Sequence, residues 1–455
     1  MHREYYRRIT ALQEAAEPFV VATVIRVHGS ASAKPGSKAI IDRTGRNILG
    51  WVGGGCAESL VREESLKALE DRLTRIVNVD LEDEVLGVGM PCGGKMDVYI
   101  EPHFPPRRLL IAGHNKLARH LNLLAQYVGY AVTVHGPEAE AQHFPGAAHI
   151  ASEPWGMLEV APGMRLIATP PHEGQAAVLR AGLAAQQGYF GFVARKKVLA
   201  GLGEQLSREG FDAAGITEVR NPAGLDLGGD TVEEISLSII GELMAWEYGA
   251  SANPLRKIEA GTASMDKSVV MGEGADGGLP ELLVVGHGRL SEELARVGTL
   301  MGWPVTVNAV ETFPEDYPPA TRLVHGDLDF SRMEVTPATH VVIATLHKGD
   351  HLSMERALQG KAAYVGLIAS RKRSGLVLDY LRERDWSDDQ LAHVRAPAGL
   401  DLGARTPAEI ALSIACEIVQ IRRSGNGGGL SRLPTAELEE GPRKSSGETC
   451  QQLFE

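Results

Sequence analysis

Hydrophobic and polar positions along the first hundred residues follow two periods, one typical of amphipathic helices and one typical of strands. Residues 3–16 place apolar side chains at helical spacing, and Phe19–Val27 is a β-branched run that predicts a strand. A helix is expected at Ala57–Asp71, and further strands are expected at Ser37–Ile41, Asn47–Val52, Arg75–Asp80 and Met96–Glu101. We therefore predict that residues 1–106, the head, form a small α+β domain that begins as a β-meander.

After residue 106 the pattern changes to strands that alternate with helices, and the whole pattern occurs twice. LLIAGHNKLA at Leu109–Ala118 returns as LLVVGHGRLS at Leu282–Ser291, and PAGLDLG at Pro222–Gly228 returns unchanged at Pro397–Gly403. The period of roughly 174 residues is far above that of a solenoid repeat, so each copy is a whole domain. Alternating strands and helices predict two Rossmann-like domains, each a doubly wound parallel sheet.

Both copies are expected to contain the same later elements and to close with a long amphipathic helix. The expected strands are Arg165–Thr169 and Tyr189–Ala194 in the first copy and His340–Thr345 and Tyr364–Ala369 in the second, and the closing helices are Thr231–Trp246 and Thr406–Arg422. Tyr248–Pro280 is rich in Gly, Ser, Ala and Asp without periodicity, which predicts a linker, and the composition after Ser424 predicts a disordered tail. The expected boundaries are 1–106 for the head, 107–250 for the first copy, 251–280 for the linker, 281–423 for the second copy and 424–455 for the tail.

Composition and charge narrow the class of protein. A chain of 455 residues with 44% hydrophobic residues can fill several cores. The net charge of −12 argues against nonspecific nucleic-acid or membrane binding, although the basic turn Arg371–Arg373 could meet a local anion. The N-terminus lacks a signal-peptide core and no stretch is long and apolar enough to span a membrane, so we expect a cytoplasmic protein. Its four cysteines are too scattered for a disulfide framework.

Each copy opens with a glycine-punctuated turn of the kind that holds a dinucleotide phosphate. The second copy has Gly286-x-Gly288-x-x-Ser291, an acceptable variant of the motif, and its helix N-terminus could receive a phosphate. The first copy places Asn115 where the phosphate would approach most closely, which favours a structural domain without a tightly bound dinucleotide. Neither copy has the acidic residue that would hold an adenine ribose, because His135-Gly136 and Asn308-Ala309 occupy those positions.

Two cysteines of the head stand in glycine-rich frames. Cys56 follows Gly53, Gly54 and Gly55 at the expected start of a helix, and Cys92 precedes Gly93 and Gly94 in a turn. A helix N-terminus lowers a thiol pKa, and glycines let a bulky ligand approach the backbone, so we predict two reactive thiols that face one cavity.

The other cysteines and the histidines support no competing site. Cys416 lies in an apolar helix and is expected to be a core residue, and Cys450 in the tail is expected to have no role. No second cysteine pair supports a zinc site. Neither do His28, His103 and His114 carry a local signature of Cys-His-Asp catalysis. The duplicated Asp226 and Asp401 lie just ahead of the long closing helices, where a carboxylate could cap N–H donors, and we expect them to serve the fold.

The motifs of the head resemble those of the xanthine dehydrogenase accessory (XdhC/CoxI) family. The resemblance rests on TVIRVHGSASAKPGSKAIID at Thr23–Asp42, on GWVGGGCAESLV at Gly50–Val61 and on CGGKMDVYIEP from Cys92 to Pro102. GYFGFVARKK and PAGLDLGGDTVEEISLSIIGE of the first copy are similar to the end of that family's Rossmann domain, and the second copy repeats this part. This sequence departs from the family pattern in its duplicated Rossmann domain and in Asn115.

The resemblance implies a molybdenum cofactor-binding maturation factor rather than an enzyme with turnover of its own. Such a chaperone holds molybdopterin, or its dinucleotide form, for an apo molybdenum hydroxylase of the xanthine or CO dehydrogenase type, and some work with a cysteine desulfurase during sulfuration. The resemblance places the metal-proximal cysteines at Cys56 and Cys92, beside Gly53–Gly55 and Gly93–Gly94, and phosphate could also bind Gly286, Gly288 and Ser291. It also implies a homodimer, whereas the duplication suggests that the second copy replaces a partner's domain in an internal pseudo-dimer.

Two hypotheses from other classes stay open at this stage. An NAD(P)-dependent oxidoreductase would use the second copy, and it would need the ribose contact that Asn308-Ala309 does not offer. A scaffold would recruit a desulfurase or the apo-enzyme without binding any cofactor. Titration with purified molybdopterin separates these classes.

Overall fold

The computed structural model describes residues 2–29, 33–53, 56–80, 94–161, 164–185, 188–255, 278–345 and 349–430. Within it the chain divides into two compact units, Met1–Arg107 and Arg108–Glu455. The first unit contains the head, and the second contains both copies of the repeat.

The head is built on a five-stranded antiparallel sheet in the order β3-β2-β1-β5-β4, so its first three strands form the meander predicted above. One face of the sheet packs against α2 and buries Val24, Val98 and Val61. At the other face, Phe19 and Ile40 pack against apolar side chains of α1. The elements are α1 (His2–Glu14), β1 (Phe19–Gly29), β2 (Lys38–Asp42), β3 (Asn47–Gly50), α2 (Cys56–Asp71), β4 (Arg75–Asp80) and β5 (Gly94–His103).

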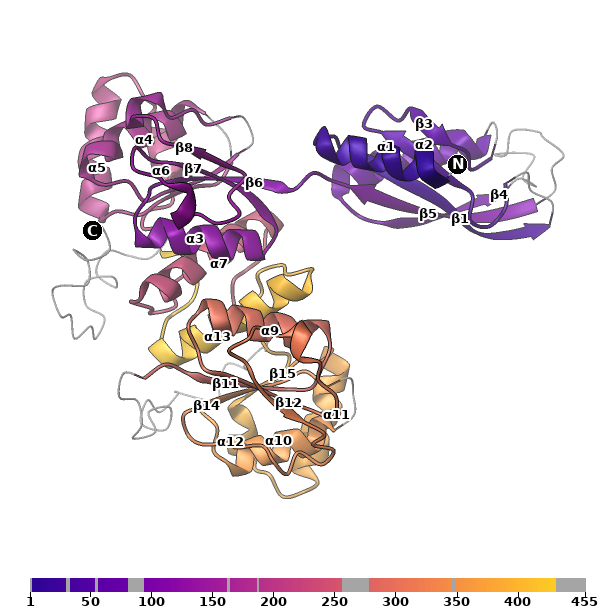
Figure 1. Ribbon diagram of the computed structural model, residues 1–455, viewed down its shortest axis with the longest axis vertical. Helices are drawn as coiled ribbons and strands as arrows, with labels where there is room; N and C mark the ends of the chain where they lie inside the picture. Colours follow the sequence, from indigo (N-terminus) through magenta and orange to yellow (C-terminus); the bar gives the residue numbers. More distant parts are fainter. Residues whose placement is uncertain are drawn as a thin grey trace. The chain divides into compact units, whose positions relative to one another are not determined.

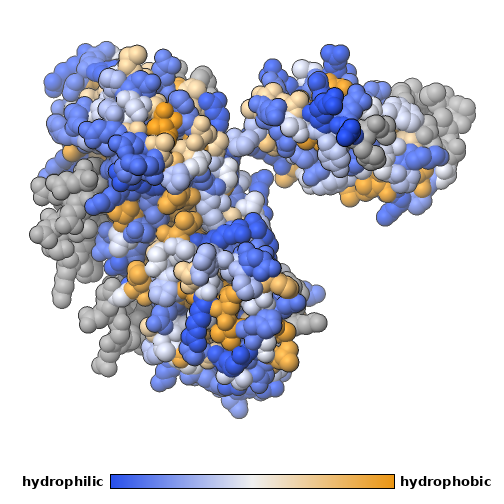
Figure 2. Space-filling model, viewed as in Figure 1, coloured by the Kyte–Doolittle hydropathy of each residue, from blue (hydrophilic) through white to orange (hydrophobic). Residues whose placement is uncertain are grey.

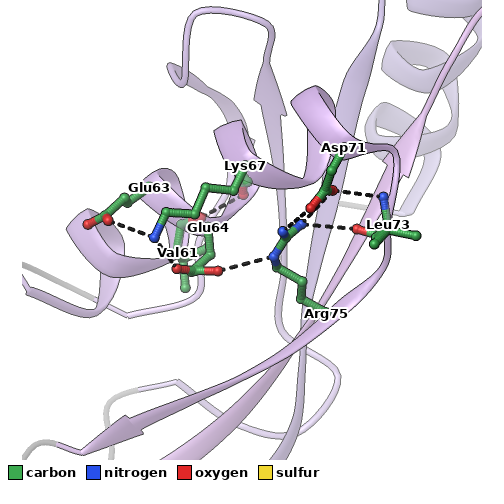
Figure 3. Close-up of polar contacts among 8 residues, drawn as sticks. Val61, Glu63, Glu64, Lys67, Asp71, Leu73 and Arg75 are labelled. Atoms are coloured by element: carbon green, nitrogen blue, oxygen red, sulfur yellow. Dashed lines mark hydrogen bonds and ion pairs between the residues drawn. The ribbon is translucent and has the colours of Figure 1, made fainter.

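Ion pairs connect charged side chains along α2 and link this helix to the start of β4 (Figure 3). Lys67 Nζ lies 2.9 Å from Glu63 and 2.8 Å from Glu64. Arg75, at the start of β4, pairs with Asp71 at the end of α2 and reaches Glu64 at 3.2 Å. These exposed pairs contribute little each, and together they fix the turn between α2 and β4.

Both copies of the repeat have the strand order of the Rossmann fold, which confirms the fold class predicted above. The first strand of each copy is central, the next two lie on one side and the later ones on the other. The first copy has the order β10-β9-β6-β7-β8, with β6 (Arg107–Ala112), β7 (Tyr130–His135), β8 (His149–Ala151), β9 (Arg165–Ala168) and β10 (Phe190–Phe192). The second has the order β13-β12-β11-β14-β15-β16, with β11 (Glu281–Val285), β12 (Val305–Ala309), β13 (Arg322–His325), β14 (Thr339–Ile343), β15 (Tyr364–Leu367) and β16 (Val394–Arg395).

The helices that follow these strands correspond between the two copies. The first copy contains α3 (Lys116–Tyr127), α4 (Gln175–Ala184), α5 (Lys196–Arg208), α6 (Ala213–Glu218) and α7 (Val232–Tyr248). The second contains α9 (Arg289–Leu300), α10 (Asp350–Gln359), α11 (Arg371–Arg382), α12 (Asp388–Ala392) and α13 (Pro407–Arg423).

The two copies share one hydrophobic core. Helices α3 and α7 of the first copy and α9 and α13 of the second lie between the two sheets, and their apolar side chains form a single cluster (Figure 1). At the crossing of α7 and α13, a Cβ on Gly241 would lie 3.2 Å from Cys416 Sγ. Tyr127 Oη donates a hydrogen bond of 2.9 Å to the backbone oxygen of Glu293, across the same boundary. The predicted contact between the copies is therefore present within one chain.

In each copy, the segment that follows the last helix crosses to the other copy and forms backbone hydrogen bonds there. Leu255 N donates to Gly399 O at 3.0 Å, and Asp401 N donates to Asn253 O at 2.7 Å. The reciprocal bonds join the second copy's end to the first copy's loop: Leu430 N donates to Gly224 O at 2.8 Å and Asp226 N donates to Gly428 O at 2.9 Å. The short segments that composition assigns to a linker and a tail thus bind the two PAGLDLG loops.

Within the described part of the chain, none of the helices has the length and apolarity needed to cross a lipid bilayer. The face drawn in Figure 2 is mostly hydrophilic, with apolar side chains in small scattered groups.

Candidate functional site

The described residues beside the two cysteine-bearing turns meet at one end of the head's sheet. Gly53 has a φ of +125°, which favours glycine, and a Cβ there would lie 3.1 Å from Met96 Cε and 3.2 Å from Ala57 Cβ. Met96 belongs to β5, which begins at Gly94, two residues after Cys92. The turn before Cys56 therefore packs against the strand that follows Cys92.

Cys56 is the first residue of α2, as the sequence predicts, and its thiol lies outside the described part of the structure. The described part of the structure also leaves out Gly54, Gly55, Cys92 and Gly93, while Gly94 is the first residue of β5. The convergence of the two thiols on one cavity stays a prediction. The described side chains contain no group of three or more His, Cys, Asp or Glu residues placed to hold a metal ion.

The glycine turn of the second copy leaves the N-terminus of α9 open. Gly286 has a φ of +116°, and a Cβ there would lie 2.5 Å from the backbone oxygen of Ala344. Gly288, the N-cap of α9, has a φ of +99°, a Cβ on it would meet nothing within 4 Å, and no side chain caps this helix. Ser291 is fully buried, and its hydroxyl has no hydrogen-bond partner among the described residues. The loop thus offers free N–H donors of a helix longer than three turns to an anion.

The corresponding turn of the first copy is closed by its own side chains. Asn115 Oδ1 accepts a 2.9 Å hydrogen bond from Ala118 N, so this side chain caps α3 where an anion would bind. Asn115 Nδ2 donates to Thr169 O at 3.1 Å. Beside this turn, the rings of His114 and His135 lie 6.0 Å and 5.8 Å from the Trp155 ring. Burial lowers the pKa of His135. Sequence reasoning missed Trp155, which lies in a short turn without periodicity.

Past the second strand, the second copy carries a buried polar pair instead of a ribose-binding carboxylate. Asn308 Nδ2 donates to Asp327 Oδ2 at 2.8 Å, and both side chains are buried. The basic turn Arg371–Arg373 forms an ion pair within the chain, because Arg373 Nε lies 3.0 Å from the buried Asp350 carboxylate. This carboxylate also accepts a hydrogen bond from the Thr345 hydroxyl. Sequence reasoning did not single out Asp327 or Asp350.

A buried carboxylate anchors each PAGLDLG loop. In the first copy, Glu242 accepts hydrogen bonds from Tyr189 Oη at 2.8 Å and from Gly224 N at 3.0 Å. In the second, Glu417 accepts from Tyr364 Oη at 2.6 Å and from Gly399 N at 2.8 Å. Burial raises the pKa of Glu242, and burial next to these carboxylates raises the pKa of both tyrosines.

Asp226 and Asp401 do not cap the long helices, which was one way in which they could serve the fold. Thr231 and Thr406 are the N-caps, and each forms a capping box with the glutamate three residues later. Asp401 Oδ2 instead accepts from Ser251 Oγ at 2.8 Å, and Asp226 Oδ2 accepts from Asn426 N at 3.3 Å. Both aspartates therefore serve the fold by holding the segment that crosses from the other copy.

Cys416 is a core residue, as predicted. It is fully buried between α13 and α7, and burial raises the pKa of its thiol well above the ordinary value. A thiol in this state is a poor nucleophile and a poor metal ligand at neutral pH.

Sequence profiles of known protein families match the chain in three places. The profile described as the XdhC Rossmann domain matches residues 109–243 and again residues 282–418. The profile described as the XdhC and CoxI family matches residues 12–80. The matches cover well over half of the chain and include both copies and most of the described head.

Curated relatives are similar over shorter stretches. Uncharacterized protein YqeB of Escherichia coli K12 is 32% identical over 155 residues, which are 33% of this chain and 28% of the relative. A protein of Bacillus subtilis 168 that is named as a probable component of xanthine dehydrogenase is 36% identical over 101 residues, 21% of this chain and 30% of the relative. The molybdenum cofactor insertion chaperone PaoD of Escherichia coli K12 is 32% identical over 69 residues, 15% of this chain and 22% of the relative. The chain thus spans less than a third of each relative.

Among solved structures, the crystal structure of a xanthine dehydrogenase from Bacillus halodurans is similar to part of this chain. The TM-score is 0.30 at 19% sequence identity, and the match covers 53% of this chain and 95% of that one.

Proposed function

The chain belongs to the XdhC and CoxI family, and we propose that it binds a molybdopterin cofactor and delivers it to a molybdenum hydroxylase of the xanthine or CO dehydrogenase type. The cofactor is cargo in this proposal, and its chemistry takes place in the client enzyme. Relatives named as a probable component of xanthine dehydrogenase and as a molybdenum cofactor insertion chaperone support a maturation role.

The observation that carries the proposal is the packing of the Gly53 turn against Met96 at the start of β5. It brings together chain segments that lead into Cys56 and out of Cys92. Two thiolates in such a place suit a soft metal centre such as molybdenum and its dithiolene, and the N-terminus of α2 favours the thiolate form at Cys56. Gly53 packs closely against Met96 and Ala57, so the room for the pterin would come from the other glycines of the two turns, Gly54, Gly55, Gly93 and Gly94.

We propose that the second Rossmann copy holds an anion site of its own, which a free phosphate or a nucleotide phosphate would occupy. Gly286, Gly288 and Ser291 are the residues in question, because α9 lacks a side-chain cap while Asn115 caps α3 in the first copy. Changing Ser291 to alanine, the residue at the corresponding Ala118, tests this role. If the hydroxyl binds phosphate, affinity falls; if Ser291 only packs, removing an unpartnered buried hydroxyl leaves binding unchanged.

The family resemblance and the fold lead to different expectations for assembly. A homodimer stays a prediction, and so does recruitment of a cysteine desulfurase for sulfuration. The surfaces of α3, α7, α9 and α13 are already buried between the two copies. We propose that the second copy takes the place of a partner's Rossmann domain, so any homodimer would use other surfaces.

Titration of the full chain with purified molybdopterin tests the proposed function. Cys56→Ser and Cys92→Ser should each weaken binding, whereas Cys450→Ser, in the predicted tail, serves as the matched control and should bind like wild type. Binding that survives both head substitutions would refute the thiol assignment. No binding by the wild-type chain would favour the scaffold hypothesis instead.

A further inference from the structure

Residues of α5 and α6 in the first Rossmann copy line a groove that the proposed function does not use. Its volume is about 680 Å³, and the groove is largely open to solvent. The walls are apolar where Leu199, Ile216 and Val219 line them. Lys196 and Asn221 line the groove as well, and so does the ion pair between Glu204 and Arg208.

Asn221 gives the groove an unsatisfied hydrogen-bond donor. The side chain is 5% exposed, and its Oδ1 accepts a 3.1 Å hydrogen bond from Ala194 N, which fixes the orientation of the amide. Its Nδ2 has no partner in the described structure. A buried amide N–H without an acceptor costs free energy, so an acceptor atom supplied by a ligand is favoured here.

Two further features add positive potential near Asn221. Lys196 is the first residue of α5, and it lines the groove. No side chain caps the N-terminus of this 13-residue helix. The Asn221 N–H donor and the positive end of the uncapped α5 together select an anionic group with acceptor oxygens, while the apolar walls select a hydrocarbon body.

The second copy lacks the residues that create this groove. Leu378 stands at the position of Gly203, and Ala396 stands at the position of Asn221. Leu378 packs against the hydrophobic core of its copy. In the first copy a Cβ on Gly203 would lie 3.0 Å from Ile216 Cγ2, so any side chain there would enter the space between α5 and α6. The duplicated fold therefore does not require Gly203 or Asn221.

We propose that this groove, bounded by Gly203, Ile216, Lys196 and Asn221, is a binding site for a small amphiphilic carboxylate. The carboxylate lies at the Lys196 and Asn221 end, and its apolar body lies along Leu199 and Ile216. The site belongs to the first copy alone, and it is separate from the glycine turn at Asn115.

The test uses octanoate as the probe on the full-length chain, with binding followed by calorimetry and by the methyl NMR signals of Ile216. Gly203→Leu introduces the second copy's own residue and should weaken binding by about tenfold or more, because the new side chain occupies the ligand's space. Gly201→Leu is the matched control, since Gly201 is exposed on the same helix with nothing within 4 Å and the second copy also has leucine there, at Leu376. This control should bind like wild type.

Asn221→Ala tests the polar end without filling the groove. Loss of one neutral hydrogen bond should weaken octanoate binding by about fivefold. 1-Octanol, which lacks the charge, should bind more weakly than octanoate. The proposal is overturned if wild type does not bind octanoate, if Gly203→Leu or Asn221→Ala binds like wild type, or if 1-octanol binds equally well. Thermal unfolding checks that each variant is folded. If Gly203→Leu does not fold, the binding measured for Asn221→Ala tests the proposal.

Discussion

Replacing Gly241 by cysteine is expected to join the two Rossmann copies by a disulfide within one chain. A Cβ at this position would lie 3.2 Å from Cys416 Sγ, so a second sulfur can reach bonding distance with little movement. Leu225 Cδ1 would lie 3.1 Å from the same Cβ, so the Leu225 side chain has to move by a few tenths of an ångström. Since the two positions correspond in the repeat, the bond would form where the matching helices α7 and α13 cross.

The expected stabilisation comes from the length of chain that the bond closes. For a loop of about 175 residues, the chain-entropy account gives about 5 kcal/mol, from which crowding at Leu225 subtracts a part. Denaturant unfolding with and without reductant measures the difference. Burial raises the pKa of the Cys416 thiol, so oxidation is carried out at alkaline pH.

The assay uses a background in which Cys56, Cys92 and Cys450 are serine. Peptide mapping should find residues 241 and 416 linked, and non-reducing electrophoresis should show the mass of one chain. Gly201→Cys, on the exposed face of α5, is the control and should form no link to residue 416 of its own chain. Links between two chains, or free thiols in both variants, would refute the packing of the two copies within one molecule.

Three further predictions concern single side chains. Burial lowers the pKa of His340 from 6.5 to about 4. As the pH drops, the unfolded chain binds this proton before the folded chain does, so the free energy of unfolding should fall by about 3 kcal/mol between pH 6.5 and pH 4. In denaturant titrations, His340→Phe should lose that part of the pH dependence. Tyr364→Phe should lower the free energy of unfolding by about 1.5–3 kcal/mol, because it removes a hydrogen bond to the buried Glu417 carboxylate. The control is Tyr6→Phe at an exposed position, and equal stability of the two variants would contradict the prediction. Asn115→Ala should cost about 1 kcal/mol through loss of the α3 cap, and an unchanged unfolding midpoint would show that the cap contributes nothing.

The regular elements can be predicted because their patterns are local. Arg75–Asp80 matches β4 residue for residue, and the predicted helix at Ala57–Asp71 differs from α2 by one residue. The repeat of LLIAGHNKLA and PAGLDLG is enough to predict two Rossmann domains, because identical local signals imply identical folds. The cap at Asn115 also has a local signal, since an asparagine at a helix start is a strong cap.

The crossing segments cannot be predicted in the same way. Residues 251–255 (SANPL) show no helix or strand periodicity and residues 425–430 (GNGGGL) are glycine-rich, and the order of both comes from backbone bonds to loops about 150–200 positions away. Proximity in sequence suggests that Asp226 and Asp401 cap helices, although the T-x-x-E pattern at Thr231 and Thr406 indicates the true caps. The thiols of Cys56 and Cys92 lie outside the described residues, so their pairing rests on the packing of Gly53 against Met96.

The number of molybdopterin molecules bound per chain tests the central claim most directly. One head and two Rossmann copies occur in each chain, so a carrier that holds the cofactor by the head thiols should bind one molybdopterin per chain. Cys56→Ser with Cys92→Ser should abolish this binding and leave the unfolding midpoint unchanged. Two cofactors per chain, or one that stays bound in the double variant, would contradict the account and would place the cofactor on the Rossmann copies.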